Sequence, residues 1–540
     1  MLSADERAVL DAAVAARAPE GVTPLPPPRV EEFSLPEVRL KPPPGLEGIV
    51  TTAPAHRLRH AFGRSFADIA RLYLRQAPHA PDVVARPSTE KEAAAVLDWA
   101  VSAGAAVIPF GGGSSVCGGV EPDVGGLYPG VVSLDLTGLN EVLEIDRTSR
   151  AARIQAGIYG PALEDALRPH GLTLRHYPQS FEFSTLGGWI ATRSGGHYAT
   201  LYTHIDDFVE STRSLTPQGA LETRRLPGSG AGPSPDRLMI GSEGTLGVIT
   251  EAWMRLQDRP RFRGSASISF PDMARGAEAV RALSQSGLFP ANCRLLDPEE
   301  ARMNGIGDGQ EAILILGFES ADHPLDAWLA RALELAADHG GRYDAEAAQR
   351  SLKKREGGAR EGAAGRWRSA FLRAPYYRDY LVARGMIVDT FESAITWDRF
   401  PDFYETVRSR MRAAIREATG NETRLSCRFT HVYPDGPAPY FSFSVLGPKG
   451  GAPEELLPAW RRIKEAANEV VVQAGGTVTH HHAVGRDHRA GYERQSPGLF
   501  REALQGAKAR LDPSGLLNPG VLIDPAGRDV GQTGVMGPGG

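Results

Sequence analysis

Three glycine-rich segments, each beside an apolar run, constrain the possible folds of this chain more than any other feature. The first is Pro109-Phe110-Gly111-Gly112-Gly113-Ser114-Ser115, directly after the apolar residues 107–108. Glycine allows positive φ angles and close backbone approach, so successive amides can point at one pyrophosphate. A triple glycine alone is more often a plain turn, so this segment by itself does not separate a phosphate cradle from a loop.

Two later segments have the same chemistry. Within 179–195, small hydroxyl residues lead into a Gly-Gly helix start, where backbone amides and the helix dipole suit an anion. Within 241–250, glycines and hydroxyl residues lead into a strand. The candidate binding residues of these two segments are Gln179, Ser180, Ser184, Thr185, Gly188, Thr192, Arg193, Ser194, Gly195, Gly241, Ser242, Glu243, Gly244, Thr245, Leu246, Gly247 and Ile249. The alternative is an α/β domain whose glycines only make turns.

The surrounding pattern predicts two different layers. Expected strands at 82–87, 107–110, 131–136 and 152–157, with a helix from 88, indicate an α/β layer that continues to about 256. Apolar runs at 266–270 and 312–318, each followed by a helical pattern, then indicate an α+β lid. A helix is expected at 4–18, an extended proline-rich strap at 19–44, a strand-like segment at 476–479 and a helix at 498–510. The predicted domain limits are 1–79, 80–257, 258–470, 471–525 and a disordered tail, 526–540.

Bulk properties narrow the class of protein. A length of 540 residues predicts several domains, and a net charge of −5 gives no general attraction to nucleic acid. Cys117, Cys293 and Cys427 are scattered without zinc or disulfide spacing. No stretch approaches the ~18 consecutive apolar residues of a membrane span, and the first residues lack the order of a secretory signal. We therefore expect a cytoplasmic enzyme.

The string Thr479-His480-His481-His482 is the most unusual in the chain. On a strand, His480 and His482 would share one face and His481 would lie on the other. Imidazoles on one face could exchange protons near neutral pH. A metal site would need a third ligand that this spacing does not signal, so none is expected. A surface or structural histidine cluster is the alternative.

The three glycine-rich segments, in this order, resemble the FAD domain shared by vanillyl-alcohol oxidase, p-cresol methylhydroxylase and the D-lactate dehydrogenases. The resemblance covers about 80–257 and is specific for the set of motifs, whereas no Gly-x-Gly-x-x-Gly follows a first strand as in a Rossmann domain. It implies an α+β fold: a two-subdomain FAD-binding domain of the p-cresol methylhydroxylase type plus an α+β cap with an antiparallel sheet. No histidine adjoins 109–115, so we expect non-covalent FAD, with a linkage from the lid left open.

The chain also resembles alkyldihydroxyacetonephosphate synthase, the ether-lipid enzyme. This resemblance covers most of 50–523 and is loose in detail. That family carries His-His-His-Gly-Val-Gly-Lys where this chain has Ala483 for the glycine and Arg486 for the lysine. Tyr440-Phe441-Ser442-Phe443 looks like the segment holding the family's catalytic tyrosine. Arg378-Asp379-Tyr380 and Asn292-Cys293-Arg294 look like its arginine-bearing segments. The resemblance implies that Tyr440, His480, His481 and His482 are catalytic and that Arg378 and Arg294 bind substrate. From the residues alone, Tyr440 could be a core tyrosine and Arg378 part of a surface ion pair.

The family exchanges the fatty acid of an acyl-dihydroxyacetone phosphate for a fatty alcohol, without net redox change and with flavin N5 as covalent carrier. This implies a lipid-like phosphate ester and a fatty alcohol as partners, a homodimer, and a Tyr440 pKa lowered from ~10 by nearby positive charge. The basic stretch 350–373, which contains Trp367 and Phe371, predicts peripheral membrane contact or, equally, a charged loop over the active site. The rival hypothesis is an FAD-linked oxidoreductase of a 2-hydroxy acid or a phenolic alcohol; a non-catalytic flavin-binding or membrane-associated scaffold is a third.

Overall fold

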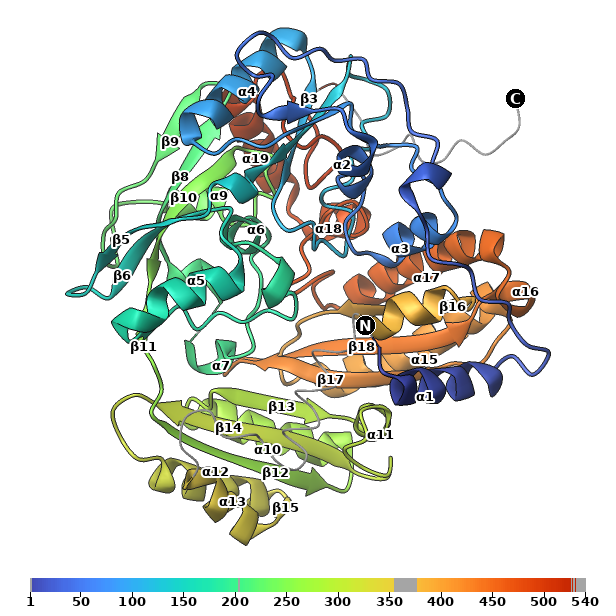
Figure 1. The fold of residues 1–540 in the computed structure, drawn as a ribbon. Coiled ribbons are helices and arrows are strands. Elements are labelled where there is room, and N and C mark those ends of the chain that lie inside the picture. Colours follow the sequence, from blue (N-terminus) through green and yellow to red (C-terminus); the bar gives the residue numbers. More distant parts are fainter. Residues whose placement is uncertain (1, 203, 354–375, 526, 528–529, 531–540) are drawn as a thin grey trace. The chain divides into compact units, whose positions relative to one another are not determined.

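The computed structural model describes residues 2–202, 204–353, 376–525, 527 and 530 (Figure 1). The chain forms two compact units, each built from separate stretches of sequence. We call residues 27–195, 204–257 and 481–540 the motif unit, since it contains all three glycine-rich segments, and residues 1–26, 196–203 and 258–480 the cap unit. Most of the basic stretch 350–373 and most of the predicted disordered tail lie outside the described residues.

A small sheet of order β1-β2-β4-β3 forms the first half of the motif unit. Strands β2, β4 and β3 are parallel, and β1 pairs antiparallel to β2 at the edge. The strands are β1 (Val50–Thr51), β2 (Val83–Ala85), β3 (Ala106–Phe110) and β4 (Val131–Asp135). They read as continuous apolar runs because parallel strands are buried on both faces.

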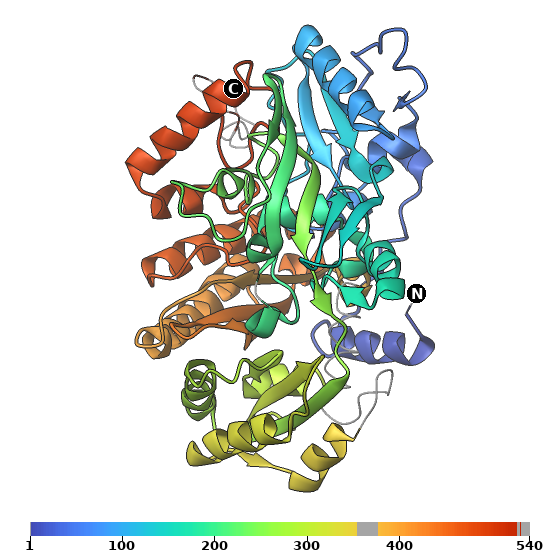
Figure 2. The same ribbon diagram turned by 90° about the vertical axis from the view of Figure 1, so that its left-hand side faces the viewer.

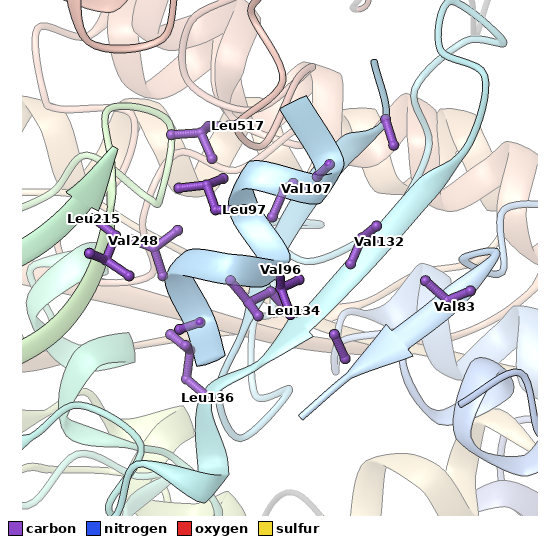
Figure 3. Packing of buried hydrophobic residues seen from close by; sticks show 14 of the residues in the cluster. Val83, Val96, Leu97, Val107, Val132, Leu134, Leu136, Leu215, Val248 and Leu517 are labelled. Atoms are coloured by element: carbon purple, nitrogen blue, oxygen red, sulfur yellow. The ribbon is translucent and has the colours of Figure 1, made fainter. Parts of the chain in front are cut away.

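Helix α4 (Glu90–Ala103) packs on this sheet and begins where the sequence predicts. The Thr89 side chain accepts from the Glu92 amide while the Glu92 carboxylate accepts from Thr89, and Gly104 ends the helix at φ 62°. Figure 3 shows Val96 and Leu97 of the helix among Val107 and Val132 of the strands, with Leu517 beside them. The residues after 510 therefore belong to the same core as the first glycine-rich segment.

The second half of the motif unit is an antiparallel sheet of order β5-β6-β10-β8-β9. Its strands are β5 (Val142–Asp146), β6 (Ala151–Gln155), β8 (Val209–Thr216), β9 (Gly219–Glu222) and β10 (Val248–Arg255). A short pair joins β7 (Leu172–Thr173) to β11 (Gln257–Asp258). The helices of the unit are α2 (Pro54–Arg59), α3 (Phe66–Tyr73), α5 (Gly160–Leu167), α6 (Leu186–Thr192), α8 (Ile205–Phe208), α9 (Asp236–Met239), α18 (Arg489–Gln495) and α19 (Gly498–Leu511).

The cap unit is built on an antiparallel sheet of order β15-β12-β14-β13-β17-β18-β16 (Figure 1). Its strands are β12 (Phe262–Phe270), β13 (Asn292–Leu296), β14 (Ala312–Ser320), β15 (Arg342–Tyr343), β16 (Met386–Glu392), β17 (Arg424–Val432) and β18 (Pro437–Leu446). Strand β12 alternates buried and half-buried residues, the period-two pattern of a strand with one face on a core.

Helices cover the cap sheet in two groups. Helices α10 (Met273–Gln285) and α12 (Asp326–Asp338) pack side by side near β12–β14, in the yellow-green part of Figure 2. Helices α15 (Phe400–Thr419) and α17 (Pro453–Gln473) pack together over β16–β18. Further helices of the cap unit include α1 (Ala4–Ala15), α7 (Ala199–Tyr202), α11 (Pro298–Met303), α13 (Ala345–Leu352) and α16 (Pro448–Gly451). The predicted α+β class and the antiparallel cap sheet are confirmed.

Most predicted elements are confirmed within a few residues, but the strand-like segment 476–479 is wrong. The chain leaves α17 and turns at Gly475, where φ is 85°. The Thr477 hydroxyl then donates to the Thr479 carbonyl at 3.0 Å, a local turn contact instead of a ladder. Among the described residues, no helix is long and apolar enough to cross a membrane.

Candidate functional site

The first and second glycine-rich segments lie against one another, and only glycine fits between them. A Cβ on Gly112 would come within 1.9 Å of the Phe183 carbonyl oxygen, and one on Gly111 within 2.3 Å of the Thr185 hydroxyl. The Gly112 clash is with backbone, so no rotamer change would relieve it, and the Gly111 clash would require the Thr185 side chain to move. The two segments therefore form one continuous wall of the motif unit.

This wall has the hydrogen-bond donors that a pyrophosphate needs. Within the described part of the chain, the amides of Gly112, Gly113 and Ser114 have no acceptor, although the loop is half-buried. The buried Ser242 hydroxyl of the third segment likewise has no partner there. Buried or half-buried donors are normally satisfied, so these groups fit a phosphate-bearing ligand such as FAD.

Several predicted binding side chains serve the shape of the second segment instead. The Trp189 indole donates to the Ser184 hydroxyl at 2.7 Å, and the Thr192 hydroxyl donates to the Gly188 carbonyl at 2.8 Å. Arg193, which ends α6 at φ 52°, pairs with Asp206 at 2.8 Å. These side-chain contacts fix the conformation of the loop, and a ligand would then bind through the loop's backbone.

The third segment ties the first segment to the residues after the histidine run. The Glu243 carboxylate accepts from the amides of Val484 and Gly485, both at 2.8 Å. Burial raises the pKa of Glu243 to about 7, although the two amides act in the opposite direction. A Cβ on Gly244 would lie 2.8 Å from the Pro109 ring. Glu243, predicted as a cofactor ligand, thus uses its side chain to position a loop.

The histidine run is not a strand, so the predicted sharing of a face by His480 and His482 is wrong. Ala483 has φ 74°, a left-handed value that no extended strand contains. The rings of His481 and His482 lie 4.7 Å apart instead of on opposite faces, and the Cys117 thiol donates to the His482 carbonyl at 3.0 Å. Backbone turns, which alternation cannot reveal, set the directions of these imidazoles.

Arg486 stands where the related family has lysine, and its contacts show a positioning role within the motif unit. Its guanidinium donates to the carbonyls of Glu121 at 3.0 Å and Pro519 at 2.9 Å. It therefore fastens the histidine segment to the closing segment of the chain.

His176 is a buried imidazole that the sequence did not single out. Its Nε2 lies 2.8 Å from the Ser194 hydroxyl, and its ring packs 5.1 Å from Trp189. Burial, assisted by the charge of His204, lowers the pKa of His176 to about 3, so it stays neutral. Burial likewise lowers the pKa of His204 to about 4; the charge of His481 adds to this effect, whereas the carboxylate of Asp206 opposes it. His176 comes three residues before Gln179, and that proximity to the second motif was the available signal.

In the cap unit, Tyr440 lies at the centre of a row across three strands. It is directly opposite Arg428 of β17 on one side and Glu392 of β16 on the other. The Arg428 guanidinium carbon lies 3.9 Å from the centre of the Tyr440 ring, and the phenol donates to the Thr390 hydroxyl at 2.9 Å. Figure 1 shows β17, β18 and β16 side by side.

The pKa of Tyr440 moves opposite to the expectation. Burial raises it, and the carboxylates of Glu392 and Asp389 add to the rise, while Arg428 and the Thr390 hydrogen bond lower it. Positive charge is present as predicted, but it is outweighed by the loss of water around the fully buried phenol. Tyr440 is therefore a protonated phenol at neutral pH.

The backbone amide of His480 contacts Glu392, the residue opposite Tyr440 on β16. The Glu392 carboxylate accepts from the Thr479 hydroxyl at 2.9 Å and from the His480 amide at 3.2 Å. The His480 Nε2 lies 2.7 Å from the Tyr433 hydroxyl, and its ring is 5.0 Å from that of His431. Glu392 thus touches the strand row of Tyr440 and the start of the histidine run.

The two predicted substrate arginines differ. Arg294 on β13 is fully buried, and burial together with the neighbouring Arg428 charge lowers its pKa to about 9. Arg378 is half-buried, and its Nε has no hydrogen-bond partner in the part of the chain that the structure describes. Arg294 is electrostatically coupled to the Tyr440 row through Arg428, whereas no described contact brings Arg378 into it. The sequence did not single out Arg428. The available signal was its position between the apolar residues Cys427 and Phe429.

Comparisons with known proteins agree with this arrangement. Residues 81–224 match the model of an FAD binding domain, and residues 259–522 match the C-terminal domain of FAD linked oxidases. An alkyldihydroxyacetonephosphate synthase of Caenorhabditis elegans is 30% identical over 492 residues, which are 87% of this chain and 80% of the relative. That of Dictyostelium discoideum is 29% identical over 494 residues, 86% and 77% of the two chains.

Solved structures give the same result. An alkyldihydroxyacetonephosphate synthase structure superposes with a TM-score of 0.76 at 26% identity and covers 94% of this chain and 92% of its own. A substrate-bound p-cresol methylhydroxylase has a TM-score of 0.68 at 14% identity, covering 98% and 99%, and so shares the fold.

The two units and their motifs define an FAD-binding protein of the FAD-linked oxidase class, and FAD is its cofactor. Within that class, the chain belongs to the alkyldihydroxyacetonephosphate synthase family and is an FAD-dependent enzyme. The predicted family and cofactor are confirmed, whereas the roles of the individual site residues stay predictions.

Proposed function

We propose that the enzyme exchanges the acyl chain of an acyl-dihydroxyacetone phosphate for a fatty alcohol. A carboxylate leaves the substrate carbon, the alcohol oxygen forms the new ether bond, and the reaction has no net redox change. The observation that supports the proposal is the buried row Arg428–Tyr440–Glu392, in which a phenol lies between one cation and one carboxylate. The family relation gives the substrate class.

The motif unit would hold FAD through the free amides of 112–114 and the Ser242 hydroxyl. Bound FAD supplies an electrophilic ring nitrogen, N5, on which the family's transfer depends. We expect the binding to be non-covalent, because no histidine adjoins the first glycine-rich segment.

Tyr440 would move a proton at its phenolic oxygen. Its hydrogen bond to Thr390 fixes the direction of that oxygen, and Arg428 favours the phenolate form when the proton leaves. The hydrogen-bonded Tyr433–His480 pair offers a second proton-transfer group in the cap unit.

A buried guanidinium would receive the substrate phosphate. Arg294 fits this role best, since a forked donor that is charged at neutral pH and lies in a water-poor site binds phosphate strongly. Arg378, with its unsatisfied Nε, is the second candidate.

The test is an anaerobic exchange assay on the holoenzyme. The enzyme receives acyl-dihydroxyacetone phosphate and labelled hexadecanol while the flavin absorbance is recorded. Labelled ether product without an electron acceptor supports the proposal. Absence of exchange, together with bleaching of the flavin by D-lactate or a phenolic alcohol, would establish the oxidoreductase instead.

We also propose that the enzyme is a homodimer that contacts membranes peripherally through the basic stretch 350–373. The basic side chains would meet anionic headgroups, and Trp367 and Phe371 the acyl boundary. Sedimentation of the protein with anionic against neutral vesicles tests the contact; equal partition would refute it.

A further inference from the structure

Arg428 and Glu300 form a buried ion pair behind Tyr440. Arg428 Nη1 lies 2.5 Å from a Glu300 carboxylate oxygen, and the two side chains are only 8% and 3% exposed. The Ser426 hydroxyl also donates to Glu300, and Arg428 Nη1 lies 3.5 Å from the Ser442 hydroxyl. A buried pair of this kind costs desolvation energy and is weak evidence for stability, so its place in the fold calls for a reason.

The pair sets the plane of the guanidinium against the phenol ring. Glu300 is on α11, which packs against β17, and its amide is held by Asp297 at 2.8 Å. Arg428 is directly opposite Tyr440 in the β17–β18 register, so the anchored guanidinium stacks on the ring at 3.9 Å. A lysine could keep the charge here but not the flat, forked contact.

The charges that face Tyr440 come from several elements. Strand β16 contributes Glu392 and Asp389, and Asp389 is itself 3.6 Å from Lys464 of α17. Strand β17 contributes Arg428. The charge of Arg428 acts directly on Tyr440, whereas Glu300 acts on Arg428.

We propose that Arg428, anchored by Glu300, is a positioning residue that holds the Tyr440 ring and stabilises its phenolate form, and thereby sets the pH range of proton transfer. The inference rests on the proposed function of Tyr440 for its catalytic consequence. The physical coupling between the two side chains is measurable without turnover.

The experiment places 3-fluorotyrosine at position 440 of the holoenzyme and follows its ionisation by ¹⁹F NMR. This analogue ionises at lower pH than tyrosine, which brings its titration closer to neutral pH. The main variant is the double change Arg428→Met with Glu300→Gln, which removes both charges and leaves no buried carboxylate unpaired. We expect the acid dissociation constant at position 440 to fall at least tenfold.

The pH profile of exchange gives the catalytic readout. In the double variant, the acidic limb of the profile should move to higher pH by an amount that matches the fall in the acid dissociation constant. Arg428→Lys, which keeps a positive charge, should show a smaller shift. The matched control is Arg424→Met on the same strand, because Arg424 is opposite Ser444 and its partner Glu299 lies 3.5 Å away near the surface. Arg424→Met should change neither readout.

An unchanged ionisation at position 440 in the double variant, within twofold, would overturn the inference even if turnover fell, since the pair would then be structural only. Failure of the proposed function looks different. In that case no ether product forms in the parent protein, while the NMR shift between parent and double variant persists.

Discussion

Tyr440 shows that a side chain's chemistry depends on neighbours far away in sequence. On β18 it follows a buried apolar pattern and could be a core tyrosine. Its partner Arg428 comes from the preceding strand, and its partner Glu392 from a strand that lies before helix α15 in the sequence. Together they make a core position into a candidate proton-transfer group. Local spacing could not predict whether burial or charge would dominate its pKa.

Tyr440→Phe should lower exchange by about 100-fold or more and leave the FAD content unchanged, because it removes only the phenolic hydroxyl group. Steady-state exchange and the flavin-to-protein absorbance ratio measure the two effects. Tyr404→Phe is the control: Tyr404 is also buried and donates to Asp297 at 3.1 Å, but lies outside the row. Equal losses in both variants would contradict the assignment.

His176 gives a prediction about pH and stability. Its pKa is about 3 in the folded protein and about 6.5 when exposed, so the unfolded chain binds the proton more tightly. The stability it contributes is therefore present above pH 6.5 and is lost as pH falls toward 3. Between pH 7 and pH 5 the loss should be about 2 kcal/mol.

His176→Gln should remove this part of the pH dependence. The measurement compares urea unfolding of parent and variant at pH 7 and pH 5, with the exposed His56→Gln as control. If the free energies of unfolding of His176→Gln and the parent differ by the same amount at both pH values, His176 is not the buried neutral imidazole described above.

At the scale of elements, the glycine-rich loop after β3 depends on what faces it. Gly111 and Gly112 pass so close to the second segment that a side chain at either position would clash with it. Helix α4 is the contrasting case, since its start at Thr89 was predicted from a local capping signal.

Gly112→Ala should weaken FAD binding at least tenfold, about 1.4 kcal/mol, because its Cβ would displace the Phe183 backbone. Fluorescence titration of the apoprotein with FAD measures the affinity. Gly506→Ala, a helical position with nothing within 4 Å, is the control and should bind FAD normally. Normal binding by Gly112→Ala would show that this wall does not contact the cofactor.

At the scale of the whole molecule, all three glycine-rich segments and the closing residues belong to one unit, although up to about 400 residues of sequence separate them. The Asn518 side chain donates to the carbonyls of Gly119 and Glu243, at 3.1 and 2.7 Å. FAD binding should therefore stabilise the motif unit as a whole.

Saturation of the apoprotein with FAD at about 100 times its dissociation constant should add about 2.7 kcal/mol to the stability of the motif unit. Calorimetry with and without FAD would show this as a rise in one unfolding transition. Gly112→Ala at the same FAD concentration should show a smaller rise; an equal one would argue that FAD binds elsewhere.

Sequence alone predicted the glycine-rich segments, the α+β class, the main strands and the family, because these depend on local backbone freedom, period and residue order. It also pointed to Tyr440 and the histidine run as residues of interest. The directions of the histidines were wrong, because the positive φ of Ala483 follows from the Cys117 and Glu243 contacts and not from alternation. Arg428, Glu300 and His176 became meaningful only in the tertiary structure, since burial and opposing charges arise from strands and helices that meet only after folding.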